Sequence, residues 1–353
     1  MEARFSPCLL VSLSPPLPFL LFIGTLFTTG CQREETAPAP PSSPPPSVAM
    51  RVLVVNEPEL AVAIERLRGE WAERFHATLS ARSATWDEIA NATSADADLI
   101  VFPSRYLGEL GAAKRLRPVR ANVLEGETYD AADLFPLARR ELVSWGGQVM
   151  AVPLGVRPLS EGLLVEVAGD VVSGDRLGDL FDPETMQPRI ADEPFVEALT
   201  RLANGEPTGG QVPVLGLDDR LIGVTTASRN AASAFRLLEW LASSEISSQL
   251  AVAVGGQQPV RRSQSSAPAW YDANQSAEQR KALGRQIERA LSGERLLIVP
   301  RIPGVDRYLA ALDAAVDRGQ SGQQEPRAAL TQAAAGWEAI TDALGRDAQR
   351  QAY

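Results

Sequence analysis

The alternation of apolar and polar positions predicts short buried strands separated by amphipathic helices. An apolar run at Arg51–Val55 is typical of a buried strand. Large apolar side chains then recur at helical spacing from Leu60 to Phe75, which predicts one helix. A second apolar run at Asp98–Phe102 predicts another strand, followed by a helix that ends near Gly111. Strands and helices that alternate at this spacing indicate a parallel sheet with helical crossovers.

Helix-capping sequences add further boundaries. The segments Thr85–Glu88 and Ser276–Gln279 have capping-box spacing, which predicts a helix that begins at Trp86 and another that extends to Leu291. Gly255–Gly256 suits the end of the helix before it, because glycine readily adopts the conformation of a helix C-cap. These signals indicate that helices continue to separate the extended segments through the chain.

The second half of the chain shows the same mixture of patterns. Extended segments are expected at Gln148–Gly155, Arg220–Thr225 and Leu296–Val299. Helices are expected at Pro194–Ala203, through Phe235 to Leu241, from Val305 to Gly319 and from Pro326 to Gly345. Residues 156–212 are rich in Gly and Pro, and within them Leu163–Val167 predicts a short strand.

The first 31 residues form a pattern of their own. An apolar run, Leu17–Phe27, leads through small residues to Cys31 and resembles a bacterial lipoprotein signal. In that family the Cys becomes the lipidated first residue of the mature chain. Two positions depart from the family pattern: Thr28 stands where Leu is usual, and Glu2 weakens the positive charge of the N-terminus.

A plain signal peptide and a single membrane anchor stay open as alternatives. The apolar run is short for a membrane span of about 20 residues, and Pro15, Pro16 and Pro18 interrupt its start. Lipidation at Cys31 is therefore the favoured interpretation. The Pro-rich residues 32–47 predict an extended tether that reaches about 50 Å at roughly 3.1 Å per residue.

Length, charge and cysteine content restrict the remaining chain to a few classes. About 306 residues follow the tether, which is enough for two α/β lobes or one large domain. A net charge of −10 argues against a nucleic-acid partner, because such binding depends on Lys and Arg that neutralise phosphates. The two cysteines, Cys8 and Cys31, both lie in the signal region, so we expect neither a disulfide nor a thiolate metal site in the mature chain.

Candidate catalytic and metal-binding groups are sparse. His76 is the single histidine and stands beside an apolar stripe, so it predicts neither a catalytic triad nor a zinc site. Asp96 and Asp98 lack the glycine and the further oxygen ligands of a calcium loop, and Gly209–Gly210 lacks the Lys of a phosphate loop. We therefore expect no enzyme, no catalytic residue, no metal and no cofactor.

Several segments, taken in their order along the chain, resemble the extracellular solute-binding proteins of ABC importers, specifically family 1, the maltose-binding-protein-like group. These segments are Arg51–Glu57, Ala97–Ser104, Trp145–Gly155, Gly223–Asn230, Ala234–Ser244, Gly255–Arg261 and Ile302–Gly304. Together they cover most of residues 50–345. The resemblance implies an α/β, two-lobed periplasmic-binding-protein-like fold of type II, with parallel or mixed sheets flanked by helices.

The resemblance also implies a division of the chain into parts. Residues 1–31 are a lipoprotein-type signal, and residues 32–47 are a Pro/Ser-rich tether. Lobe 1 comprises residues 48–152 plus 213–258, and lobe 2 comprises residues 153–212 plus 259–353. The interval from Val156 to about Val212 is much shorter than in the family, so we expect a reduced second lobe. Both an evolutionary shortening and a defective reading frame are compatible with this interval.

Polar and aromatic side chains follow the predicted strands, at the place where ligands of open α/β sheets lie. The candidate ligand-binding residues are Asn56, Glu57, Phe102, Ser104, Arg105, Tyr106, Trp145, Thr225 and Tyr308. This mixture of hydrogen-bonding groups and rings suits a small hydroxylated solute such as a sugar. For Asn56 and Ser104 a helix cap is an equal alternative. For Trp145 and Tyr308 the alternative is packing in the core or between lobes.

These observations predict a lipid-anchored solute-binding protein in the cell envelope, with its globular part outside the cytoplasm in the periplasm or at the cell surface. The resemblance implies a small-molecule solute and ABC permease subunits as partners, attachment to the membrane through lipid at Cys31, and a monomer. A degenerate binding-fold lipoprotein that serves as an interaction or sensing module without transport is the alternative, because the shortened interval leaves solute binding open.

Overall fold

The computed structural model describes residues 48–353 except 93–95, 171–179, 208–211 and 294–295. The proposed lipidation site Cys31, the signal and the tether therefore lie outside the described residues, as does Gly209–Gly210. Within the described ranges, no helix combines the length and the apolarity that a membrane crossing requires.

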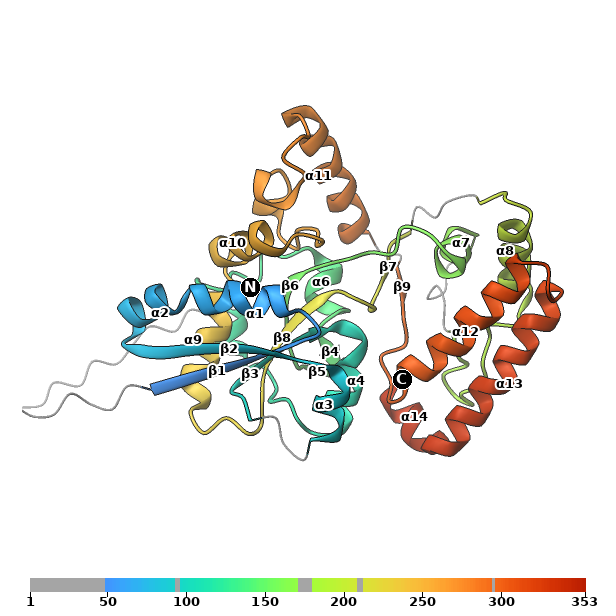
Figure 1. The fold of residues 1–353 in the computed structure, drawn as a ribbon, viewed down its shortest axis with the longest axis horizontal. Coiled ribbons are helices and arrows are strands. Elements are labelled where there is room, and N and C mark those ends of the chain that lie inside the picture. The colour runs from blue at the N-terminus through green and yellow to red at the C-terminus, as the bar shows by residue number, and fades with distance from the viewer. Residues whose placement is uncertain (1–47, 93–95, 171–179, 208–211, 294–295) are drawn as a thin grey trace, which may run out of the picture. The chain divides into compact units, whose positions relative to one another are not determined.

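A mixed five-stranded sheet forms the centre of the first part of the fold. Its strands are β1 (Val48–Val55), β2 (Ala77–Ala84), β3 (Leu99–Pro103), β6 (Val152–Gly155) and β8 (Arg220–Val224). They are arranged in the order β2-β1-β3-β8-β6 (Figure 1). The strands β2, β1 and β3 are parallel, as the alternation with helices predicts for β1 and β3, and β8 is antiparallel to both β3 and β6.

The helix expected from Leu60 to Phe75 is two helices in the structure, α1 (Pro58–Arg66) and α2 (Arg68–Phe75). At Leu67 the backbone N–H donates to the carbonyl of Ile64, a tight turn that interrupts the regular ladder. The edge strand β2, which follows at once, was not expected. Its sequence contains little apolar bulk, and its pairing with β1 rather than its own pattern makes it a strand.

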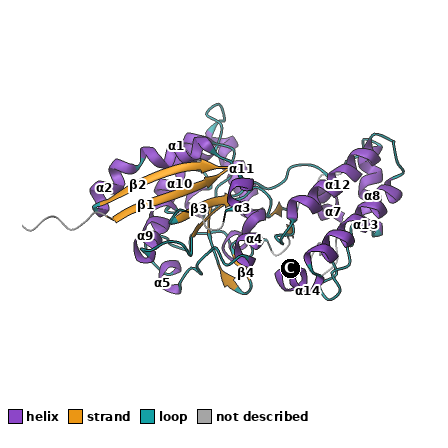
Figure 2. Ribbon diagram, turned by 60° about the horizontal axis from the view of Figure 1, so that its bottom comes forward, coloured by secondary structure: helices purple, strands orange, loops and turns teal. Residues whose placement is uncertain are grey.

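Helices cover both faces of this sheet, with α1 and α2 on one side and α9 (Ala231–Leu241) on the other (Figure 2). The capping box at Thr85 begins α3 (Trp86–Asn91), as predicted. The remaining α-helices of this part are α4 (Leu107–Ala112), α5 (Ala121–Leu124), α6 (Pro136–Arg140), α10 (Ser244–Val254) and α11 (Ala277–Ser292), and its short strands are β4 (Ser144–Trp145) and β5 (Gln148–Val149). A 3-10 helix spans Ser104–Tyr106.

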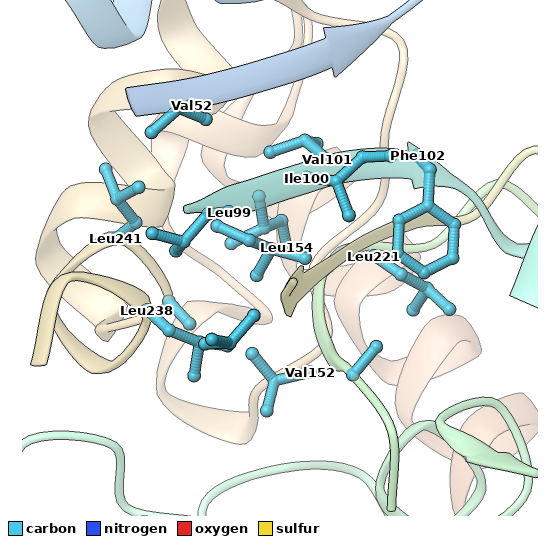
Figure 3. Packing of buried hydrophobic residues seen from close by; sticks show 14 of the residues in the cluster. Val52, Leu99, Ile100, Val101, Phe102, Val152, Leu154, Leu221, Leu238 and Leu241 are labelled. Carbon is cyan, nitrogen blue, oxygen red and sulfur yellow. The ribbon is translucent and has the colours of Figure 1, made fainter. Parts of the chain in front are cut away.

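Apolar side chains from the sheet and from α9 form the centre of the larger hydrophobic cluster. Figure 3 shows Phe102 of β3 beside Leu221 of β8, whereas Leu238 and Leu241 of α9 lie nearer to Leu99. All of these side chains are buried. Burial of one such side chain stabilises the fold by about 1.5–3 kcal/mol, so this cluster holds the strand ends in fixed relative positions.

A second hydrophobic cluster is built mainly from helices. It combines α7 (Leu163–Asp170), α8 (Glu193–Ala203), α12 (Val305–Gln320) and α13 (Pro326–Leu344), with α14 (Arg346–Ala352) after them (Figure 1). Its described strands are β7 (Val214–Leu215) and β9 (Leu297–Ile298), two residues each and parallel to one another.

The strand predicted at Leu163–Val167 is wrong, because these residues lie in α7. Four of them bury their side chains in the second cluster, which also contains residues of α8. A short apolar run has the same composition in a buried helix and in a buried strand, and only the tertiary partners decide between them. The helix α14, beyond Gly345, was not expected either.

The two clusters do not coincide with the lobe boundary expected at residue 258. Val260, Ile287 and Leu291 lie in the first cluster, although the sequence assigned them to the second lobe. In α11, Gly284 lies so close to the Ser265 carbonyl that a Cβ placed there would be 2.0 Å from its oxygen. Clusters describe side-chain packing, and the lobe boundaries themselves stay a prediction.

Candidate ligand-binding site

One edge of the five-stranded sheet gathers most of the charged side chains near the expected site. The C-terminal ends of β1 and β3 meet the beginning of β8 there, because β8 runs antiparallel and pairs Arg220 with Pro103. The residues at or beside this edge are Glu57, Ser104, Arg105, Tyr106, Arg157, Asp218, Asp219, Arg220 and Asp306. We call this set the polar edge.

Glu57 and Arg220 form an ion pair within the polar edge. Arg220 Nη2 lies 2.6 Å from Glu57 Oε2, and its Nε lies 3.4 Å from Oε1. The Arg220 side chain is only 5% exposed. A guanidinium buried to this degree requires a charged or hydrogen-bonding partner, so Glu57 is committed to Arg220 in this conformation.

Ser104 and Asp219 connect three segments of the chain. Ser104 Oγ donates to Asp219 Oδ2 at 3.0 Å, and the same carboxylate accepts hydrogen bonds from the backbone N–H of Gly216 at 2.6 Å and of Arg157 at 2.8 Å. Burial raises the pKa of Asp219, and these hydrogen bonds oppose the shift. Ser104 therefore serves Asp219 and does not cap a helix.

Arg105 and Tyr106 form a stacked arrangement with Trp86. The Tyr106 ring lies on the Trp86 ring, with centroids 3.8 Å apart and planes 7° apart, and the Arg105 guanidinium lies 4.9 Å from the Tyr106 centroid. Arg105 Nη1 is paired with Asp218 at 2.6 Å. Burial raises the pKa of Tyr106 to about 12, so its hydroxyl remains a donor at neutral pH. It donates to Asp306 at 2.9 Å.

The other predicted residues lie outside this arrangement. Asn56 Oδ1 accepts from the backbone N–H of Trp86 at 3.1 Å, which is a contact to α3. Phe102 is buried beside Leu221 (Figure 3). Trp145 packs against α4 at Gly111, where an added Cβ would lie 2.5 Å from the indole. These side chains therefore contact the protein itself in this conformation.

Tyr308 faces the second cluster rather than the polar edge. Its side chain is buried, its hydroxyl lies 3.0 Å from Thr341 Oγ1, and its ring packs edge-on against Trp337 and Phe181. The residue of α12 that reaches the polar edge is Asp306, two positions earlier. Sequence reasoning did not single out Asp306, because an acidic residue in a first helical turn is common for electrostatic reasons alone.

Thr225 lies at the opposite end of the sheet from Ser104. Because β8 is antiparallel to β3, Val224 pairs with Leu99 and Thr225 follows beside Asp98. Thr225 is five positions after Arg220 in the chain, which corresponds to about 17 Å of extended strand. The Thr225 hydroxyl donates to the Ala97 carbonyl at 2.5 Å. The structure therefore does not bring Thr225 together with the other candidates, and Arg220 stands in its place.

Two cavities lie away from the polar edge. The larger of them, of 620 Å³, opens beside α7, α8 and α12, and none of the nine predicted ligand residues lines it. Its lining residues are Ser160, Glu161, Gly162, Glu166, Leu202, Pro207, Val316 and Gln320.

His76, the single histidine of the chain, ends α2 with a left-handed backbone (φ 53°). Among the residues that the structure describes, no three His, Cys, Asp or Glu side chains are placed to hold a metal ion together.

The fold matches solved structures of binding proteins. The sugar-binding protein MalE from Xanthomonas citri matches with a TM-score of 0.67 and 15% sequence identity, over 84% of this chain and 98% of that chain. The maltose-bound MalE3 of T. maritima matches with a TM-score of 0.57 and 13% identity, over 83% and 100% of the two chains. An ABC transporter solute-binding protein from Agrobacterium radiobacter in complex with ribitol has a TM-score of 0.57 and 14% identity, over 83% and 98%.

No protein-family model matches the sequence, and no curated protein matches it. At identities this low, the structural likeness shows the fold alone. The fold is α/β, with a mixed sheet flanked by helices, and it is the two-lobed periplasmic-binding-protein fold of type II.

Proposed function

We propose that this protein is the lipid-anchored, extracytoplasmic solute-binding component of an ABC importer, and that it carries a small hydroxylated solute to permease subunits. The observation that carries the proposal is the stack of Arg105, Tyr106 and Trp86 at the end of β3. It places two stacked and largely buried aromatic rings next to side-chain donors, with the carboxylates of Asp218 and Asp306 beside them. Sugars and polyols complement this combination, because their hydroxyls can hydrogen-bond to the donors and carboxylates and their C–H groups can pack against rings.

The fold supports the same class of solute. The neighbours include a sugar-binding protein, a maltose complex and a ribitol complex, and each is matched over at least 98% of its own chain. The proposed ligand residues are the four predicted ones that lie in the polar edge, Glu57, Ser104, Arg105 and Tyr106. Of these, Arg105 has the side chain best placed for direct contact, because it is 21% exposed, whereas Tyr106 is 2% exposed and its ring is stacked on Trp86.

Thermal-shift screening of the purified protein tests the proposal. We expect sugars or polyols to raise the unfolding temperature in a concentration-dependent way, since a ligand that binds only the folded state stabilises it. Amino acids and polyamines serve as the comparison classes. Absence of a shift with every class, from a sample with normal helix content, contradicts the solute-binding role.

The proposed attachment to the membrane rests on the N-terminal sequence. We propose that Cys31 carries lipid and that residues 32–47 tether the globular part, as a monomer, outside the cytoplasm. Cys31→Ala should release the protein from the membrane fraction and abolish incorporation of labelled palmitate, whereas Cys8→Ala should change neither. Equal labelling of the two variants contradicts lipidation at Cys31.

A second candidate is an envelope interaction or sensing module that binds no solute. It is favoured by the side-chain partners of the predicted ligand residues, because Glu57, Ser104 and Arg105 are each paired with a protein carboxylate or guanidinium. The reduction of the second lobe that the sequence predicts would favour it as well; the described strands of the second cluster, β7 and β9, are two residues long. Small-angle scattering separates the candidates, since a transport component becomes more compact on binding a solute and a module without a solute does not.

A further inference from the structure

Asp306, in the first turn of α12, reaches across to the segment that follows β3. Its Oδ2 accepts the hydrogen bond from the Tyr106 hydroxyl at 2.9 Å, and its Oδ1 lies 3.3 Å from Arg105 Nε. Tyr106 and Asp306 are 200 positions apart in the sequence. The contact therefore depends on the tertiary arrangement and not on local structure.

Arg105 and Tyr106 are held in place without help from Asp306. Tyr106 rests on Trp86, and Arg105 rests on Tyr106 while its Nη1 is paired with Asp218. The Arg105 backbone N–H also donates to the Leu217 carbonyl at 3.2 Å. The Tyr106 hydroxyl and the Arg105 guanidinium are thus two oriented groups at the end of β3. Asp306 accepts a hydrogen bond from the first and forms an ion pair with the second, without a hydrogen bond to its Nε.

Asp306 itself is loosely held. Its side chain is 52% exposed, whereas that of Arg105 is 21% exposed. An ion pair with one solvated partner stabilises little, and a ligand that offers the same hydrogen bonds can displace it. A separate contact keeps the beginning of α12 next to α4: Glu109 Oε1 accepts from the Gly304 backbone N–H at 2.9 Å. Asp306 can therefore leave its donors while α12 stays docked.

We propose that Asp306 is the solute-competing residue of α12: in the empty protein its carboxylate accepts the hydrogen bond of the Tyr106 hydroxyl and pairs with the Arg105 guanidinium, the two groups that a hydroxylated solute takes when it binds. The inference rests on the proposed solute-binding function. Binding then requires Asp306 to move away, and the apparent affinity is reduced by the fraction of molecules in which Asp306 holds the donors. A solute must supply acceptor oxygens beside an apolar face to replace it.

A double-mutant cycle on the full chain in mild detergent tests the contact. Tyr106→Phe removes the donor, Asp306→Asn removes the charge of the acceptor, and the double variant measures their coupling. We expect the coupling to change the unfolding equilibrium constant about fivefold, because a hydrogen bond to a charged acceptor is stronger than a neutral one. Asp313→Asn, on an exposed turn of the same helix, is the control and should be additive with Tyr106→Phe. Additivity in both cycles overturns the inference and leaves the proposed function intact.

Solute binding tests the competition. With D-glucose and sorbitol as the first probes, and then the probe that gives the largest thermal shift, we expect Asp306→Asn to bind about threefold to tenfold more tightly than the unaltered protein. Asp313→Asn should bind as the unaltered protein does. Unchanged or weaker binding by Asp306→Asn overturns the competition. If neither protein binds any probe of the screen, the proposed function fails, and the competition fails with it, whatever the cycle shows.

Discussion

Arg220 at the beginning of β8 and Glu57 at the end of β1 are 163 positions apart in the sequence, yet their side chains meet at 2.6 Å. The pair lies where two parallel strands and one antiparallel strand share an edge of the sheet. It places a nearly buried guanidinium within the polar edge, and it makes Glu57 a structural partner as well as a candidate ligand residue.

Loss of the Glu57 carboxylate charge should destabilise the protein more than loss of a neighbouring charge. Glu57→Gln leaves the buried Arg220 without its counter-ion, and we expect a loss of about 2–3 kcal/mol, less than for a fully buried pair because Glu57 is partly solvated. Glu59→Gln, on an exposed position of the same helix start, should change stability by less than about 0.5 kcal/mol. Denaturant unfolding of the two variants measures the difference, and equal effects contradict the assignment.

The close approach of α4 to the segment before α12 predicts a strong effect of one methyl group. A Cβ at Gly108 would lie 1.5 Å from the Arg301 carbonyl oxygen, so Gly108→Ala forces backbone apart and should cost more than about 2 kcal/mol. Gly69→Ala is the control, because no atom lies within 4 Å of its added Cβ, and it should be neutral or stabilise α2 by up to about 1 kcal/mol. Thermal unfolding distinguishes the two, and a neutral Gly108→Ala contradicts the observed packing.

The raised pKa of Tyr106 predicts a loss of folding stability at high pH. Its folded pKa of about 12 is above the usual 10, so the folded state keeps the phenolic proton after the unfolded chain has lost it. The contribution is therefore complete below pH 10 and is lost as the pH rises through about 12. Tyr106→Phe should remove about 1–2 kcal/mol of the stability decline over this range. Unfolding measured from pH 9 to 12 checks the slope, and parallel curves for the two proteins contradict it.

The two ends of the sheet should respond differently to mutation. Arg105→Lys keeps the charge but loses the planar group that stacks on Tyr106 and pairs with Asp218, so solute affinity should fall about tenfold. Thr225→Val removes a buried hydrogen bond to Ala97 and should cost about 1 kcal/mol of stability without a change in affinity. Titration of each variant with the solute identified by thermal shift separates the effects, and a loss of affinity in Thr225→Val refutes the placement.

Local signals predicted the helix boundaries well. The capping boxes at Thr85 and Ser276 begin α3 and α11, and Pro326 begins α13, because these signals act within one helical turn. The strand β2 and the helix nature of Leu163–Val167 were missed. In both segments a tertiary partner decides the conformation. The polar segment β2 is a strand because it pairs with β1, and Leu163–Val167 is helical because its apolar side chains pack in the second cluster.

The candidate site was predicted in part. The loop after β3 was expected to carry site residues, and Arg105 and Tyr106 do lie together on the polar edge. Trp86, Asp306 and Arg220 were not expected there. Nothing in the residues near Trp86 in sequence indicates a partner twenty positions away, and the antiparallel direction of β8 exchanges Thr225 for Arg220 at this edge. Which candidates contact a solute stays a prediction.

The sequence by itself determined the elements whose causes are local: the periodic apolar faces, the capped helix starts and the alternation that makes an α/β fold. It also supplies the predicted membrane address at Cys31. Only the tertiary structure decided the direction of β8, the partners of Glu57 and Ser104, and the choice of Asp306 over Tyr308 at the polar edge. These contacts depend on which distant segments pack together. An ion pair or a strand pairing links two positions that are far apart in the chain, so the sequence around either position does not reveal the other.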